Sequence, residues 1–198
     1  MKLIEVQQKL NQSGLKVFSK LEFRRLLGIS KIAAQKLLER YTKRGVLVRL
    51  KGGLYVLKTS CPSLFLIANR LYEPSYVSFE TALSFYRLIP ETVYTLTSAT
   101  TKVTREFVAV KNRFKYHKIK KKAFTGYRLT EIESEMVLFA EKEKALADYL
   151  YFVFLKKKKL NDRLQLKGIS WPRLNFFLSL FDKPGLKQWV KNAFRKTA

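Results

Sequence analysis

In the first 44 residues, apolar positions recur every three or four residues, the spacing that gathers side chains on one face of a helix. Three short helices are therefore predicted, over residues 2–11, from Ser19 to Leu27, and from Ser30 to Arg44. The apolar positions expected to face their common core are Leu3, Val6, Leu10, Leu21, Leu26, Leu27, Ala34, Leu37, Leu38 and Tyr41.

The polar residues between these segments are typical helix ends. Ser19 precedes Glu22 by three residues, the spacing of a capping box in which each side chain bonds the other residue's backbone N–H. Gly28 is expected to end the second helix, because glycine readily adopts a left-handed conformation. Ser30 is a strong N-cap for the third helix, and Gly45 ends it. The pattern predicts two helices joined by a tight turn.

Two β-rich runs follow the third helix. Residues 46–50 and 54–57 flank the glycine-bearing turn Lys51-Gly52-Gly53, which predicts a β-hairpin. The order helix, helix, turn, helix, hairpin is that of a winged helix-turn-helix. We therefore assign residues 1–60 to a DNA-binding domain of this type.

Residues 61–198 are predicted to form a second domain, a mixed α/β unit with its own core, so the fold class is α+β. Cys61-Pro62 breaks the hairpin, Ser78 is expected to cap a helix, and Lys111-Asn112-Arg113 is a predicted hairpin turn. The expected helices lie at 63–72, 78–88 and 141–155, with one or two between Trp171 and the end, and the expected strands at 93–97, 106–110, 114–119 and 136–140.

The net charge is the most informative property of the composition. The chain has 40 Lys and Arg against 15 Asp and Glu, a net charge of +25, which favours a polyanionic partner. Residues 1–60 carry +11 and residues 156–198 carry +10, whereas residues 128–155 carry −3. Nucleic acid is the leading partner, and an anionic membrane surface is the alternative.

A membrane role finds little support. The longest apolar run, residues 149–155, is far shorter than the roughly 18 residues that a spanning helix requires. The first residues lack the apolar stretch and cleavage site of a signal peptide. We expect a cytoplasmic protein that does not bind membranes.

The third helix carries the main prediction of DNA contact. Lys31, Gln35 and Lys36 are predicted to enter the major groove, where Gln can pair with adenine and Lys with guanine or phosphate. Arg40 and Lys43 are expected on phosphates. A solvated charged face on a protein-interaction module is the alternative reading. The full predicted DNA-binding set is Ser19, Lys20, Ser30, Lys31, Gln35, Lys36, Arg40, Lys43, Arg49, Lys51 and Gly52.

Two lysine runs suggest a secondary basic patch that adds DNA contacts. A role in solubility alone explains such runs equally well. The residues are Lys120, Lys121, Lys122, Lys156, Lys157, Lys158 and Lys159.

No catalytic, cofactor or metal site is predicted. Cys61 is the single cysteine and His117 the single histidine, and His117 is expected at the surface or half-buried on a strand. The sequence has no glycine-rich phosphate loop and no nucleophile elbow. Glu143 and Asp148 are expected to cap the helix or to pair with Lys144 and Arg128. The carboxylates Glu80 and Glu91 show no catalytic spacing either.

Several segments together resemble a known family. After the predicted winged helix come the stretches 71–83 (LYEPSYVSFETAL), 88–91 (LIPE), 94–98 (YTLTS) and 140–148 (AEKEKALAD). In order and spacing they are similar to the AbiEi antitoxins of type IV, abortive-infection toxin–antitoxin systems. The resemblance extends to about residue 150 and is weaker over the basic tail, whose four-lysine run departs from the family pattern.

The resemblance implies a repressor that binds inverted repeats in the promoter of its own operon. It also implies that the C-terminal domain opposes an AbiEii toxin, a nucleotidyltransferase-like protein, without a stable complex. Residues 143–148 match a motif of this family, but we assign them no catalytic role. From the residues alone they are expected to form a helix turn that holds the C-terminal core, with Ala145, Leu146 and Tyr149 inward. Two alternatives stay open: a nucleic-acid-processing enzyme with a DNA-binding head, and an antitoxin that binds only protein.

Overall fold

The computed structural model describes residues 2–60 and 62–194, and the chain divides into two compact units, Met1–Leu71 and Tyr72–Ala198. The predicted division after residue 60 therefore comes too early, and Cys61 itself lies outside the described residues. The helix at 64–71 belongs to the first unit, because Arg70 Nη2 lies 2.6 Å from Glu22 Oε1 in the second helix of that unit. This ion pair fixes the helix to the predicted capping box.

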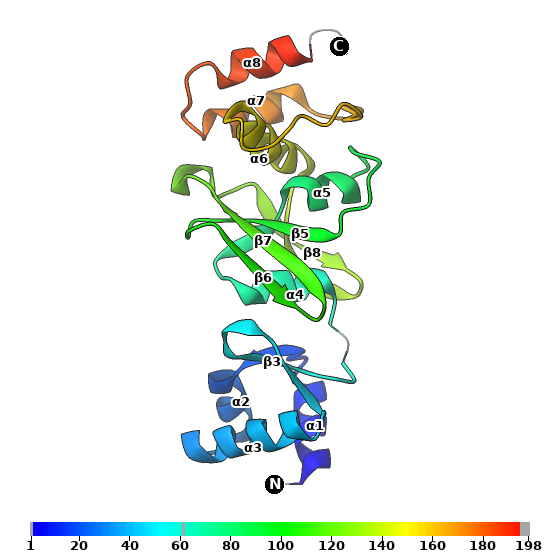
Figure 1. The fold of residues 1–198 in the computed structure, drawn as a ribbon, viewed down its shortest axis with the longest axis vertical. Helices are drawn as coiled ribbons and strands as arrows, with labels where there is room; N and C mark the ends of the chain where they lie inside the picture. Colours follow the sequence, from blue (N-terminus) through cyan, green and yellow to red (C-terminus); the bar gives the residue numbers. More distant parts are fainter. Residues whose placement is uncertain (1, 61, 195–198) are drawn as a thin grey trace. The chain divides into compact units, whose positions relative to one another are not determined.

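The first unit contains the three predicted helices and the predicted hairpin, together with one strand that the sequence did not predict. That strand, β1, pairs antiparallel with β3, so the sheet has three strands in the order β1-β3-β2. The elements are α1 (Leu3–Gln12), β1 (Val17–Ser19), α2 (Lys20–Leu27), α3 (Lys31–Lys43), β2 (Leu47–Arg49), η1 (Lys51–Gly53), β3 (Leu54–Leu57) and α4 (Leu64–Leu71) (Figure 1).

The helix ends are those that the sequence predicted. Ser19 Oγ accepts a hydrogen bond from the backbone N–H of Glu22, and Glu22 Oε2 accepts one from the backbone N–H of Ser19. Gly28 follows α2 with φ +66°, and Ser30 Oγ accepts from the backbone N–H of Ala33 at the start of α3. These caps satisfy backbone N–H groups that a helix leaves unpaired, and so fix where α3 begins.

One of the apolar positions predicted to face the core of the first unit lies at the surface instead. Leu21 is 46% exposed, and Phe23 is fully buried on the inner side of α2 in its place. Phe23 stacks on Phe18 of β1, with 5.5 Å between ring centroids. The buried cluster consists of Val6, Leu10, Phe18, Phe23, Leu27, Ala34, Leu38, Tyr41, Leu47 and Leu57.

The second unit has a six-stranded mixed sheet in the order β6-β7-β5-β4-β9-β8 (Figure 1). β4 pairs antiparallel with β5 and parallel with β9, and β5 pairs parallel with β7. The predicted α+β class is confirmed. The elements are β4 (Ser75–Val77), α5 (Phe79–Phe85), β5 (Thr95–Thr100), β6 (Arg105–Ala109), β7 (Asn112–Lys118), η2 (Lys121–Ala123), β8 (Tyr127–Ile132), β9 (Glu135–Ala140), α6 (Lys142–Phe154), α7 (Trp171–Ser179) and α8 (Leu186–Ala193).

Within this unit, β4 and β8 were not predicted, and the β6–β7 turn lies at residues 110–111, because Asn112 and Arg113 already pair in the ladder. Ser78 does not cap α5 with its side chain. Its Oγ instead donates a hydrogen bond to Asp148 Oδ2 on α6, at 2.7 Å. Helix α6 packs against α5 and is followed by α7 and α8 (Figure 1). Across the described residues, every helix is too short or too polar to traverse a lipid bilayer.

Candidate functional site

Helix α3 presents a polar face to solvent. Ala34, Leu38 and Tyr41 are buried against α1 and α2, as their spacing predicted. Ala33, Leu37 and Thr42 are partly buried, and the other positions are exposed to solvent. The exposed polar residues of this face are Lys31, Gln35, Lys36, Glu39, Arg40 and Lys43.

Gln35 is held in place by two hydrogen bonds. Its Oε1 accepts from Lys20 Nζ of α2 at 2.7 Å, and its Nε2 donates to Glu39 Oε1 one turn later at 3.0 Å. The structure therefore brings Lys20 and Gln35, two predicted DNA-contacting residues, together across the helix pair. A ligand that bonds the Gln35 amide has to replace these internal partners.

The two predicted serines have structural roles. Ser19 and Ser30 both use the side-chain oxygen to cap a helix, so each hydroxyl already serves a backbone N–H. Arg40 lies at the far end of the face, with its guanidinium carbon 5.1 Å from the ring centroid of Tyr41. Lys43, in the last turn, is exposed.

The hairpin tip carries the other predicted contacts. Arg49 ends β2, and Lys51 and Gly52 lie in the short 3-10 turn that follows; all three are exposed. Gly52 has φ +74°, a conformation that favours glycine, so the tip conformation depends on this residue.

Sequence reasoning missed Ile32. This residue is 69% exposed in the first turn of α3, three positions before Gln35. A large aliphatic side chain in open solvent among polar groups is a feature of contact surfaces, and in a major groove it can meet a thymine methyl group. The signal was present in the sequence, because Ile32 falls outside the stripe formed by Ala34, Leu38 and Tyr41.

The first predicted lysine run, on and before η2, is exposed. Lys121 and Lys122 face solvent, and Lys120 Nζ donates a hydrogen bond to the backbone oxygen of Asp182 at 3.0 Å. Lys120 thus links this loop to the segment between α7 and α8.

The second run, after α6, does not form one surface. Lys156 and Lys159 are exposed, and Lys157 Nζ lies 5.8 Å from the ring centroid of Phe152. Lys158 turns inward, is only 14% exposed, and places Nζ 2.5 Å from Glu80 Oε1. Lys158 is therefore an ion-pair partner of Glu80 and not a member of an open patch.

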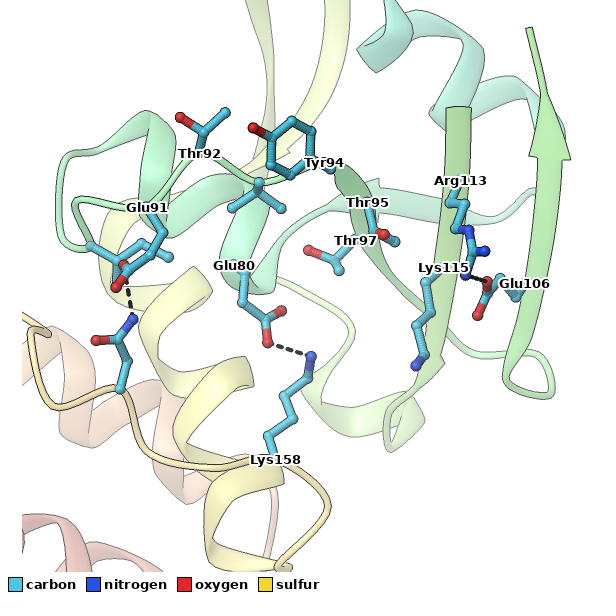
Figure 2. Close-up of a pocket in the computed structure, with 13 residues that line it drawn as sticks. Glu80, Glu91, Thr92, Tyr94, Thr95, Thr97, Glu106, Arg113, Lys115 and Lys158 are labelled. Atoms are coloured by element: carbon cyan, nitrogen blue, oxygen red, sulfur yellow. Dashed lines mark hydrogen bonds and ion pairs between the residues drawn. The ribbon is translucent and has the colours of Figure 1, made fainter. Parts of the chain in front are cut away.

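This ion pair borders a cleft of about 530 Å³ in the second unit, a feature that the sequence did not predict. Figure 2 shows Glu80 and Lys158 on one side, Lys115 and Arg113 on the other, and Thr95 and Thr97 between them. The cleft also includes the paired side chains Glu91 and Asn161, joined by a hydrogen bond of 2.9 Å, as well as Tyr94 and Glu106.

His117, on the same strand as Lys115, is buried, contrary to the predicted surface or half-buried position. Its ring packs edge-on against Phe79 and Phe152, at 4.8 and 5.0 Å between centroids. Burial, with further repulsion from Lys158, Lys115 and Lys157, lowers the pKa of His117 to about 3. The imidazole is therefore neutral at physiological pH and acts as an aromatic core residue.

The predicted pairing of Asp148 is present, but it is entirely buried. Lys144 and Asp148 form an ion pair on α6 with neither side chain exposed, whereas Glu143 Oε1 accepts a hydrogen bond from the backbone N–H of Ser170. Ala145, Leu146 and Tyr149 are buried, as expected. Because neither side chain is exposed, the pair has the character of a structural element.

Among residues 2–60 and 62–194, no group of three or more His, Cys, Asp and Glu side chains is arranged to hold a metal ion. In comparisons with known proteins, no family model matches the chain, and no curated protein is significantly similar to it. The AbiEi resemblance thus rests on the segments quoted above.

Proposed function

We propose that this protein is a DNA-binding transcriptional repressor whose first unit acts as a winged helix-turn-helix. In this proposal α3 enters the major groove of an inverted-repeat operator in the promoter of its own operon. Lys31, Gln35 and Lys36 read bases, whereas Arg40 and Lys43 contact phosphates. The hairpin tip, with Arg49 and Lys51, is the wing.

The observation that carries this proposal is the open face of α3. A recognition helix needs one side buried for position and the other free for the groove, with cations near its ends. Helix α3 meets these conditions, and its start is fixed by the Ser30 cap and the turn at Gly28. The net charge of +11 over residues 1–60 favours attraction to duplex DNA.

We further propose that the protein is a cytoplasmic antitoxin that opposes an AbiEii-like nucleotidyltransferase toxin without a stable complex. This part rests on the sequence resemblance, which extends over most of the second unit. The antitoxin role is tested by expressing the neighbouring toxin gene in cells with and without this protein and measuring cell growth. Failure of the protein to restore growth would remove the antitoxin assignment and leave the repressor assignment standing.

The repressor proposal is tested by gel shifts of the full chain on promoter DNA from its own operon. Gln35→Ala and Lys36→Ala are each expected to weaken operator binding about tenfold or more, because a good base contact contributes about 1–3 kcal/mol of discrimination. Gln8→Ala and Lys9→Ala are matched controls, since both residues are exposed on α1, outside the helix-turn-helix.

Binding of the wild type should also fall steeply with salt, because neutralised phosphates release counterions. Unchanged operator binding by both α3 variants would exclude α3 as the reading helix. Tight co-purification with the neighbouring gene product and no operator preference would instead favour an antitoxin that binds only protein.

A further inference from the structure

The register of the second sheet explains how the cleft is built. In the ladder, Thr95 lies opposite Arg113 and Thr97 opposite Lys115, while Glu106 of β6 lies opposite Lys115 on its other side. Partners in register point to the same face of a sheet. One face of β5, β7 and β6 is therefore hydroxyl-bearing and charged at the point where α5 and the segment after α6 leave it uncovered (Figure 2).

Most charges in this cleft are paired within the protein. Glu80 pairs with Lys158, Glu91 with Arg163 at 2.6 Å, and Arg113 contacts Glu106 at 3.7 Å. Over the described part of the chain, Lys115 has no ion-pair partner, although Glu106 lies directly across the ladder from it. An ammonium group on the wall of a cleft with no carboxylate bound to it is suited to an anionic group of a ligand, such as a phosphate.

The opposite wall holds an acceptor atom that lacks a hydrogen-bond donor among the described residues. Glu80 Oε1 accepts from Lys158, but its Oε2 is buried and has no hydrogen-bond partner among the described residues. A buried acceptor without a partner destabilises the state that contains it. Glu80 lines the cleft, so the partner that we expect for this oxygen is an N–H group of a ligand bound there.

The rim adds an aromatic surface. Tyr94 is 86% exposed, and Figure 2 shows its ring above the wall that holds Glu80. An exposed ring at the edge of a polar cleft offers a flat face for stacking, and every nucleobase presents such a face. Three requirements thus converge on one ligand: an anionic end for Lys115, an N–H donor for Glu80, and a planar ring for Tyr94.

We propose that this cleft binds a nucleoside phosphate, with the phosphate at Lys115, the base stacked on Tyr94, and a base N–H donated to Glu80. The volume of about 530 Å³ is within the usual range of small-ligand sites, roughly 300–1,000 Å³. Guanine fits the donor requirement well, because its N1–H and its amino group lie side by side on one edge. This site is separate from α3 and does not depend on DNA binding.

Isothermal titration calorimetry of the full chain with guanosine 5′-monophosphate tests the proposal, with guanosine and inorganic phosphate titrated separately. A salt concentration of about 0.3 M suppresses long-range attraction to a chain of net charge +25. We expect one nucleotide to bind per chain, and each fragment to bind at least about tenfold more weakly than the nucleotide. Phosphate that binds as tightly as the nucleotide would overturn the assignment of the base.

Variants identify the site. Lys115→Ala and Tyr94→Ala are each expected to weaken nucleotide binding about tenfold, through loss of a charge-assisted bond and of a stacking surface. Lys118→Ala is the matched control, because Lys118 is an exposed lysine of the same strand with the opposite facing. The proposal would be overturned if Lys115→Ala and Tyr94→Ala bound the nucleotide as tightly as the wild type does. It would also be overturned if the wild type bound no nucleotide at millimolar concentration.

Glu80→Gln tests the base contact separately. Gln keeps the shape but presents an amide in place of the carboxylate, so guanosine monophosphate should bind more weakly while phosphate affinity stays unchanged. Thermal unfolding of each variant shows whether the second unit is intact. If Glu80→Gln does not fold, the test rests on Lys115→Ala, because Lys115 lies at a partly exposed position.

Discussion

Lys144 Nζ lies 2.5 Å from Asp148 Oδ1 inside the second unit, and neither side chain is exposed to solvent. Asp148 Oδ2 accepts two further hydrogen bonds, from the Tyr76 hydroxyl at 3.0 Å and from Ser78 Oγ at 2.7 Å. Burial raises the pKa of Asp148 and lowers that of Lys144, and the contact between the two opposes both shifts. The pair joins α6 to β4 and to the start of α5.

Removal of one charge from this pair should be strongly destabilising. Asp148→Asn leaves a buried ammonium group without its counter-charge, and we expect it to lower the free energy of unfolding by about 3–5 kcal/mol in urea titrations. Asp162→Asn, at an exposed position, is the control and should change it little. The double variant Lys144→Met with Asp148→Leu should lower the free energy of unfolding by less than the sum of the two single substitutions. An additive result would show that the two residues are not coupled.

The buried imidazole of His117 should make stability depend on pH. Its pKa of about 3 in the folded protein is below the value near 6.5 expected in the unfolded chain, so the unfolded state binds the proton first as the pH falls. Stability is unaffected by this group above about pH 6.5 and declines below it, by about 2 kcal/mol at pH 5.

His117→Asn removes this titration, and His117 is the only histidine in the chain. The difference in unfolding free energy between the wild type and this variant should therefore shift in favour of the variant between pH 7.5 and pH 5. A difference that stays constant over this interval would show that the imidazole is not held neutral.

Ile32 provides a test of how α3 reads DNA. If its side chain meets a thymine methyl group, replacement of that thymine by uracil should weaken operator binding about fourfold, the effect of one buried methyl group. In Ile32→Ser the same replacement should have no further effect. Gel shifts with thymine replaced one position at a time identify the base, and equal losses in both proteins would exclude the contact.

The lysines after α6 should separate into two classes. Lys158→Ala leaves Glu80 without its partner and is expected to destabilise the second unit by about 1–3 kcal/mol, whereas Lys157→Ala should have little effect. Lys156→Glu with Lys159→Glu changes only exposed positions, so it tests DNA contact by this segment. An unchanged salt dependence of operator binding in that variant would assign the run to solubility.

The sequence predicted the first unit well because its helix ends are encoded locally. The Ser19–Glu22 box, Gly28 and Ser30 act within a few residues of one another, and the structure has each of them as expected. Strands β1 and β4 were missed because each has only three residues and, unlike β2, neither is followed by a glycine-bearing turn that marks a hairpin.

The second unit was harder because its polar contacts join distant segments. Lys144, which the sequence offered only as a possible partner of a nearby carboxylate, is fully buried beside Asp148, Tyr76 and Phe181. The cleft brings together residues from α5, β5, β7 and the segment after α6. Only the strand register shows that Thr97 and Lys115 are neighbours, and a sequence without that register gives no such signal.

The two hydrogen bonds that hold the Gln35 amide, from Lys20 and to Glu39, give this residue a fixed orientation before any partner arrives. A base that offers both a donor and an acceptor at the right separation can exchange with these bonds at little cost, whereas a base that offers only one leaves part of the amide unsatisfied. Discrimination would then come chiefly from rejection of mismatched sequences, and Lys20→Met or Glu39→Leu would relax selectivity without abolishing attachment to DNA.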